Sequence, residues 1–446
     1  MPKFRRKIAL NVLLVLVFML LLISFLFGYS RCYNNIIAGF ALFFSVYAMY
    51  IYRKNSALFL TLFFIAYTNY SIVVGVYWDE SLRFPYFDQI SSISTYGIGI
   101  MCVMLFSFCI CYFSMFIKDY SRGRFSITAA DKHIQGNILI SAICVLVYIF
   151  CFVYGLIYAT SSIDGRIGNS AIKEYRIIFL VISLVYSKHI NLVKKIWFIV
   201  LTVTTLIVMF GGSRADALGP LMCFFVYYYS DSTTDRQITL MLIPTIIIMA
   251  AVGYFRTNFT FSMESFVYTI DKLASDKLTY EGAIAAYFPS LAMIEVSHML
   301  GFGEKILLFG RHLIYILLGS KIGDPNLAFF TRVYFQHFNG FISPSYFYVW
   351  TGMMSPVLLA LIVFIYVRML YTIGNPSMQK YCLQRRNLAV ALYFLTTVFR
   401  WYEYGPMGLL RGVFVFAVIY FLIFLFDSLL RGCASFKRRT RFDNRI

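Results

Sequence analysis

Two short connections in this chain place an arginine at the start of a predicted helix. The first is residues 210–216, Phe-Gly-Gly-Ser-Arg-Ala-Asp, in which Ser213 is a suitable N-cap and Asp216 its capping-box partner three residues later. Free N–H groups at a helix start attract anions, and the paired glycines let a ligand approach the backbone closely. Arg214 would add two parallel charged hydrogen bonds, a geometry that suits phosphate. The alternative is that Gly-Gly-Ser is only a tight turn.

The second connection, residues 400–411, repeats this combination at the head of the last apolar segment. Pro406 fits the first turn of a helix, and Arg400 and Arg411 flank that turn. A helix start with two arginines is again suited to holding a phosphate.

Three residues between these arginines add other chemistry. Trp401 and Tyr402 have aromatic faces that are able to stack on sugar rings. Glu403 is a candidate catalytic carboxylate. It could equally be a structural partner of Arg400, since the two are spaced i,i+3.

A third stretch, residues 332–340, joins a cation, an imidazole and two amides. His337 is a candidate general base, because an imidazole has an unperturbed pKa of about 6.5 and accepts protons near neutrality. Most lone histidines are structural, which is the alternative for this one. Arg332 in the same stretch and Arg256, which follows a predicted helix, are further candidates for binding phosphate or sugar.

The composition shows which solvent surrounds these residues. The chain of 446 residues is 60% hydrophobic, 19% aromatic and only 13% charged, a mixture that a water-soluble domain could not bury in one core. Apolar runs near the roughly 20 residues needed to cross a bilayer recur along it. We predict an all-α polytopic membrane protein with about twelve spans, near 8–27, 36–52, 57–77, 91–117, 138–158, 176–186, 195–210, 215–229, 238–254, 345–371, 387–399 and 407–430.

The net charge of +19 follows from topology rather than from nucleic-acid binding. With the N-terminus in the cytoplasm and twelve crossings, most Lys and Arg fall in inside segments, while the outside is close to neutral. Only Cys32 of the nine cysteines is then outside, so a disulfide framework is not expected. The short outside connections carry almost only arginine, and the alternative for each one is a contact with lipid heads. These arginines are Arg31, Arg83, Arg166, Arg176, Arg214, Arg400 and Arg411.

Four regions follow from this pattern. Residues 1–254 hold the first nine spans, and 345–430 hold the last three. The connection 255–344 is far longer than ordinary loops and is predicted outside, with its apolar parts 283–300 and 306–319 forming interfacial or re-entrant helices. Residues 431–446 form a basic cytoplasmic tail, so both termini are expected in the cytoplasm.

Several of these features together resemble the bacterial Wzy O-antigen polymerases. They are Gly211-Gly212-Ser213-Arg214 at the end of a central helix, the long outside segment, and Phe309-Gly310-Arg311 … Gly319-Ser320-Lys321 leading to Pro344-Ser345 … Gly352. The architecture matches along the whole chain, whereas the motifs cover about a quarter of it. The glutamate often present before the final glycine of that pattern is absent, because residues 346–351 contain no acid.

The resemblance implies a GT-C-like glycosyltransferase of the bacterial inner membrane that joins undecaprenyl-diphosphate-linked oligosaccharide repeats at the periplasmic face. Its partners would be these lipid-linked sugars, the bilayer and a chain-length regulator. Without a metal-binding pattern, fixed arginines would stabilise the diphosphate, and no cofactor or metal ion is expected. Arg214, Arg256, Arg400 and Arg411 would hold the diphosphate, while His337 or Glu403 deprotonates the acceptor hydroxyl.

Two other functions remain open from sequence. A flippase for lipid-linked oligosaccharides also has about twelve helices, but flippases usually keep outside loops short, so the segment 255–344 favours an enzyme. An O-antigen ligase differs only in its acceptor, and the sequence separates it poorly from a polymerase.

Overall fold

The computed structural model describes most of the chain. The described residues are 2–117, 136–160, 170–187, 190–210, 214–230, 277–319, 327–337, 340–372 and 381–443, with isolated residues at 232–233, 236–238, 240–241, 271 and 275. Within these residues all regular structure is helical, and the one β-type contact is a parallel bridge between Phe341 and Tyr404. The predicted all-α class is therefore confirmed for this part of the chain.

Eight of the described helical segments are long and apolar enough to cross a membrane. They are Ile8–Phe27, Arg31–Tyr52, Ser56–Trp78, Ile93–Phe116, Ile138–Ile157, Asn191–Val208, Ser343–Tyr371 and Met407–Leu430. A shorter apolar helix covers Ala217–Tyr229. The chain therefore has the character of a multi-pass membrane protein. Of the four further predicted spans, the one at 238–254 lies almost entirely outside the described residues.

One group of helices is built on α2 and α4, which pack against each other; α3 packs on α2, and α1 and α16 pack on α4. The span that contains α3 is the most enclosed, with 83% of its apolar stretch buried, whereas α1 lies at the edge with 22% buried. Side-chain caps start three of the helices: Ser30, Asn55 and Ser92 each accept a hydrogen bond from a backbone N–H of the first turn. The members of this group are α1 (Pro2–Phe27), α2 (Arg31–Tyr52), α3 (Ser56–Ile72), α4 (Ile93–Phe113) and α16 (Ser355–Thr372).

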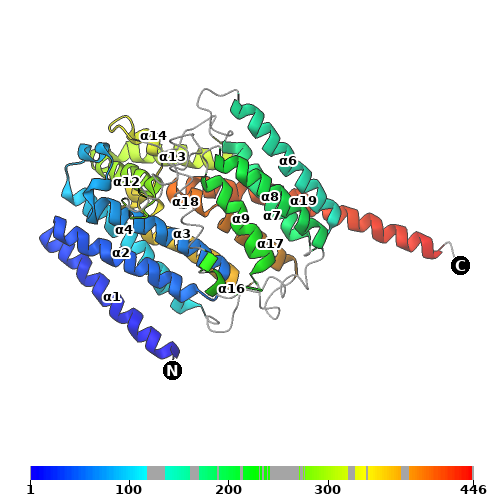
Figure 1. Cartoon of the computed structure of the whole chain (residues 1–446), viewed down its shortest axis with the longest axis horizontal. Coiled ribbons are helices and arrows are strands. Elements are labelled where there is room, and N and C mark those ends of the chain that lie inside the picture. The colour runs from blue at the N-terminus through cyan, green and yellow to red at the C-terminus, as the bar shows by residue number, and fades with distance from the viewer. Residues whose placement is uncertain are drawn as a thin grey trace.

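A second group lies beside the first, and Figure 1 shows its green helices next to the blue ones. In this group α6 packs on α7, α8 on α9, and α17 on both α7 and α9. Contacts of α3 with α9 and α17 join the two groups. The members are α6 (Ile138–Thr160), α7 (Ser170–Ser187), α8 (Asn191–Phe210), α9 (Arg214–Tyr229), α17 (Tyr381–Thr396) and α19 (Met407–Asp443).

Short helices cover the end of the bundle where α1 ends and α2 begins, which we call the distal end (Figure 1). The π-helix η1 (Val73–Trp78) extends α3 there, and the 3-10 helices η2 (Glu80–Leu82) and η3 (Pro85–Gln89) lead to α4. The long connection supplies α12 (Glu281–Met299), α13 (Phe302–Leu318) and α14 (Leu327–Thr331). The chain then passes through η5 (Ser343–Ser345), α15 (Tyr348–Thr351) and η6 (Gly352–Met354) into α16, and α18 (Val398–Glu403) joins α17 to α19.

The two apolar helices of the long connection behave differently. α12 is buried on nearly all sides among α3, α4 and α14, and Gly75 of η1 makes room for Ile284, because a Cβ there would collide with that side chain. α13 buries only Leu308 and His312 and leaves a broad apolar face exposed. Of the predicted interfacial or re-entrant helices, the first is enclosed by protein and the second lies on its surface.

A turn before α12 is fixed to α3 and η2. Lys277 and Leu278 have positive φ angles of 52° and 56°, a strained conformation that surrounding contacts must hold. Tyr70 donates a hydrogen bond to the Lys277 carbonyl over 2.8 Å, and Tyr67 donates one to the Leu278 carbonyl over 2.9 Å. The Lys277 ammonium lies 2.7 Å from Asp79, and hydrogen bonds from Lys277 and Ser81 lower the pKa of Asp79 to about 2. The ion pair therefore persists at all but very acidic pH.

We expect the distal end to face away from the cytoplasm, because reversing it would put the basic segments on the wrong side of the membrane. A thiol reagent that cannot cross membranes should then label Cys32, which is exposed at the start of α2, in intact spheroplasts. In a Cys32→Ser background it should label Val333→Cys, a position that is 79% exposed. Labelling only after the membrane is permeabilised would show that the orientation is wrong.

Candidate functional site

Helix α18 lies where the two helix groups meet at the distal end. It packs against α3, α9, α12, α17 and α19, so its six residues contact both groups. Figure 1 shows α18 near the centre of the molecule, between the blue and green helices. The predicted arginine connection at 400–411 is therefore central rather than peripheral.

Two of the predicted arginines lie around one carboxylate. Burial raises the pKa of Glu174 of α7, and the nearby charges of Arg400 of α18 and Arg411 of α19 oppose that rise. Tyr393 of α17 interacts with Glu174 and Arg400 as well. Four helices thus bring two cations, a carboxylate and a phenol together at the distal end, and an anion held there would meet two fixed guanidinium groups.

The guanidinium group of Arg411 is held by α13. Its central carbon lies 5.0 Å from the centroid of the Tyr315 ring, within the range of a cation–π contact. Gly319 leaves the space that the guanidinium needs, since a Cβ at that position would be 2.7 Å from Nη2. The φ angle of Gly319, +87°, also favours glycine. The orientation of Arg411 is therefore set by tertiary contacts from a distant part of the chain.

The predicted phosphate-binding helix start belongs to the same region. α9 begins at Arg214 and packs against α7, α17 and α18. Gly219 allows this close approach, because a Cβ there would collide with the Thr396 carbonyl. Residues 211–213, with the predicted N-cap Ser213, lie outside the described residues, as does Arg256. The structure thus packs α9, the helix that begins at Arg214, against α18 and leaves the capping box a prediction.

One arginine of α7 has an unsatisfied group on the side that faces α6. Arg176 is only 7% exposed, and its guanidinium carbon lies 5.3 Å from the centroid of the Phe152 ring. Its buried Nε atom has no hydrogen-bond partner within the part of the chain that the structure describes. Buried polar groups are nearly always hydrogen-bonded to protein, water or ligand, so this N–H is available to an external acceptor.

Trp401 and Tyr402 do not have the accessible aromatic faces that we predicted for stacking on sugar rings. Both are completely buried, with exposures of 0%, so neither ring has a free face for a sugar. The Trp401 Nε1 atom donates to the Phe394 carbonyl over 3.4 Å, and the Tyr402 hydroxyl donates to Asn69 Oδ1 over 2.6 Å. The sequence did not reveal this, because an aromatic ring looks the same whether it faces protein, lipid or a sugar.

Glu403 is also enclosed. It is 1% exposed, and its Oε1 atom accepts a hydrogen bond from Thr68 of α3 over 3.1 Å. Its backbone carbonyl accepts a bond from the Phe341 N–H over 2.6 Å. This carboxylate therefore binds α18 to α3 in the structure, an arrangement that differs from an acid exposed to an acceptor sugar.

A buried polar chain continues from Tyr402 into the first helix group. Asn69, which accepts from Tyr402, donates to Ser45 of α2 over 2.8 Å. The Ser45 and Ser107 hydroxyls are 2.9 Å apart. All of these groups are buried, so they fix how α2, α3, α4 and α18 pack against one another.

His337 keeps an accessible position. It is partly exposed, its Nε2 atom lies 2.9 Å from the Thr331 hydroxyl, and its ring centroid is 5.6 Å from that of Phe288 in α12. Four residues later Phe341 binds the Glu403 carbonyl, so the backbone at His337 is within about 14 Å of that of Phe341, beside the end of α18. Arg332 is exposed in the same stretch.

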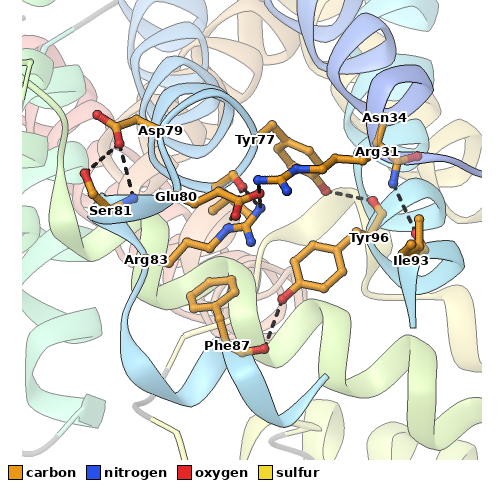
Figure 2. A network of polar contacts seen from close by, with 11 residues as sticks. Arg31, Asn34, Tyr77, Asp79, Glu80, Ser81, Arg83, Phe87, Ile93 and Tyr96 are labelled. Atoms are coloured by element: carbon orange, nitrogen blue, oxygen red, sulfur yellow. Dashed lines mark hydrogen bonds and ion pairs between the residues drawn. The ribbon is translucent and has the colours of Figure 1, made fainter. Parts of the chain in front are cut away.

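Two other arginines that were predicted to lie outside have structural partners. Figure 2 shows Arg31 and Arg83 meeting at Glu80: Arg31 forms an ion pair with this carboxylate, and Arg83 lies 3.0 Å from it. The Arg83 Nε atom also donates to the Val76 carbonyl over 2.7 Å, and its guanidinium carbon lies 5.4 Å from the centroid of the Tyr96 ring. These contacts tie α2 to η2 and α4, which explains both arginines without a ligand.

The residue that sequence reasoning missed is Glu174. An acid in the second turn of a mainly apolar helix was a visible signal, since ionisable residues near a membrane are costly and usually functional. Its neighbours Arg400 and Arg411 are far away in the sequence, and only the packing of α7 against α19 brings the three together.

Comparison with known proteins adds no assignment. No protein-family model matches this chain, and neither a curated protein nor a solved structure shows a significant similarity to it.

Proposed function

We propose that this protein is an integral-membrane glycosyltransferase of the GT-C type that polymerises undecaprenyl-diphosphate-linked oligosaccharide repeat units into O-antigen at the periplasmic face of the bacterial inner membrane. The observation that carries the proposal is the cluster at the distal end. The charges of Arg400 and Arg411 both act on Glu174 there, and α9, the helix that begins at Arg214, packs against α7 and α18.

The proposed reaction needs a fixed positive site. The acceptor hydroxyl oxygen forms a bond to the anomeric carbon of the donor sugar, and the bond from that carbon to the diphosphate oxygen breaks. Negative charge then grows on the diphosphate. Guanidinium groups that are already oriented stabilise that charge without reorganising, which is usually the largest contribution to catalysis. The Tyr315 contact gives Arg411 this fixed orientation.

The proton of the acceptor hydroxyl goes to His337 in this proposal. The imidazole is partly exposed, whereas the Glu403 carboxylate is enclosed. A positioned general base typically contributes about 10²–10⁴-fold to the rate, so His337→Gln should lower turnover of the purified protein by about this factor. A variant with normal turnover would assign the base to another group.

The function itself is tested by polysaccharide profiles in a strain that lacks the native gene. We expect single repeats on lipid A core in the deletion strain, and long chains when the gene is restored. Loss of all repeats, including single ones, would instead indicate a ligase or a flippase.

We expect turnover to be independent of metal ions, because arginines can neutralise the diphosphate. Purified protein in nanodiscs should polymerise lipid-linked repeats at the same rate with EDTA as with magnesium. A rate that falls with EDTA and returns with magnesium or manganese would refute this prediction.

A further inference from the structure

Helix α13 presents an apolar face that the rest of the described chain leaves uncovered. Six of its large apolar side chains are exposed on that face: Ile306, Leu307, Leu313, Ile314, Leu317 and Leu318. Leu317 and Leu318 are 61% and 64% exposed. With a rise of 1.5 Å per residue, the part of the helix from Ile306 to Leu318 makes a strip about 18 Å long.

The opposite face of α13 is fixed to distal parts of the bundle at both ends. Near its start, Trp350 of α15 donates a hydrogen bond to the Lys305 carbonyl over 2.9 Å. At the middle, the His312 Nε2 atom lies 2.8 Å from the Tyr346 hydroxyl. Near its end, Tyr315 and Gly319 contact Arg411. Since α15 and the start of α19 are both at the distal end, α13 lies across that end, as an interfacial helix does.

The end of the exposed strip coincides with the arginine cluster. Leu317 and Leu318 lie between Tyr315 and Gly319, the two residues that hold the Arg411 guanidinium group. An apolar strip that ends at a fixed cation matches an amphiphile with a long hydrocarbon chain and an anionic head. An exposed apolar residue on α19 does not lie next to this cation in the same way. Leu422 is 57% exposed, but it lies three turns beyond Arg411 on the same helix.

We propose that the exposed face of α13 binds the polyprenyl chain of the donor, with its diphosphate at Arg411. This inference rests on the proposed function and adds the place where the lipid carrier lies. The chain would run from Leu318 back along α13 toward Ile306, so that burial of its apolar surface contributes to donor affinity. Arg411 would then bind the diphosphate head group, and α13 would bind the polyprenyl tail.

Photocrosslinking tests this arrangement in nanodiscs of stated lipid composition. A photoreactive phenylalanine analogue replaces Leu317 in one protein and Leu422 in a matched control, and the probe is radiolabelled undecaprenyl diphosphate. We expect labelling at position 317 that excess unlabelled undecaprenyl diphosphate reduces at least tenfold and that undecaprenol, which lacks the diphosphate, reduces little. Position 422 should give only weak labelling that does not saturate. Equal labelling at both positions that does not saturate would mean that bulk lipid covers α13. Crosslinks between two copies of the chain would mean that this face is an oligomer interface. Either result would overturn the inference.

Chain-length dependence supplies a second measurement. Leu317→Ser/Leu318→Ser should weaken binding of undecaprenyl diphosphate roughly tenfold, the effect expected for losing part of two buried leucines. Binding of geranyl diphosphate, which has a much shorter chain, should change little. Equal weakening of both ligands would overturn a tail-binding role. Binding of undecaprenyl diphosphate that depends on Arg411 but gives no labelling at position 317 would mean that only the proposed place of the tail is wrong. The absence of any saturable binding would refute the proposed function as well.

Discussion

Arg411→Gln should reduce polymer synthesis by roughly 10²–10³-fold, the loss typical when one preorganised donor to a developing anion is removed. The physical reason is the fixed position of this guanidinium group, which lies over Tyr315, and its charge acts on the same buried Glu174 as that of Arg400. Arg411→Lys keeps the charge but loses the planar fork, so it should still lose a large part of the activity. Initial rates with lipid-linked repeats in nanodiscs, at equal amounts of folded protein, measure both effects.

Arg31→Lys is the matched control for this experiment. Arg31 was also predicted to lie outside, but it forms an ion pair with Glu80 and lies at the start of α2 rather than in the arginine cluster. We expect less than about a twofold change in rate, because exposed ion pairs contribute little and lysine can replace arginine there. If the Arg31 and Arg411 lysine variants both make normal long chains, the guanidinium of Arg411 does not bind the diphosphate.

The largest effect on stability should come from substituting Asp427, which lies in the C-terminal half of α19. This carboxylate is 3% exposed, its Oδ2 atom lies 3.3 Å from Arg385 Nη1, and its Oδ1 atom accepts a hydrogen bond from Asn137 over 2.9 Å. The Arg385 guanidinium carbon is also 4.5 Å from the centroid of the Tyr186 ring. Asp427→Ala leaves a buried cation without this partner, which costs roughly 3–5 kcal/mol.

Thermal unfolding in detergent, followed by size-exclusion chromatography, measures this cost as a lower midpoint. Ser428→Ala is a suitable control, since the neighbouring Ser428 is exposed and only donates to the Phe424 carbonyl. The double variant Arg385→Met/Asp427→Leu should recover most of the stability, because it removes the whole ion pair rather than one half. A single variant with the midpoint of the natural protein would show that the ion pair is not coupled to folding.

The sequence alone was enough to predict the membrane class and most of the helices. Long apolar runs must span or line a bilayer. The predicted spans at 36, 57 and 91 start near the helices that Ser30, Asn55 and Ser92 cap, and these caps are local hydrogen bonds that the prediction did not use. These signals depend on nearby residues, so no knowledge of the tertiary structure is needed to read them. The arginines at 214, 400 and 411 were found in the same way, from residue type and from their position at predicted helix starts.

Tertiary structure decided which of these residues lie together and which are buried. The apolar faces of a membrane helix pack equally well against lipid or protein, so the sequence of α18 could not show that Trp401, Tyr402 and Glu403 point into the bundle. The partners that fix them, Asn69 and Thr68, come from α3, more than half the chain away. Only the packing of α7, α18 and α19 brings Glu174 near Arg400 and Arg411. Electrostatic interactions of this kind depend on distance in space and leave no pattern in the sequence.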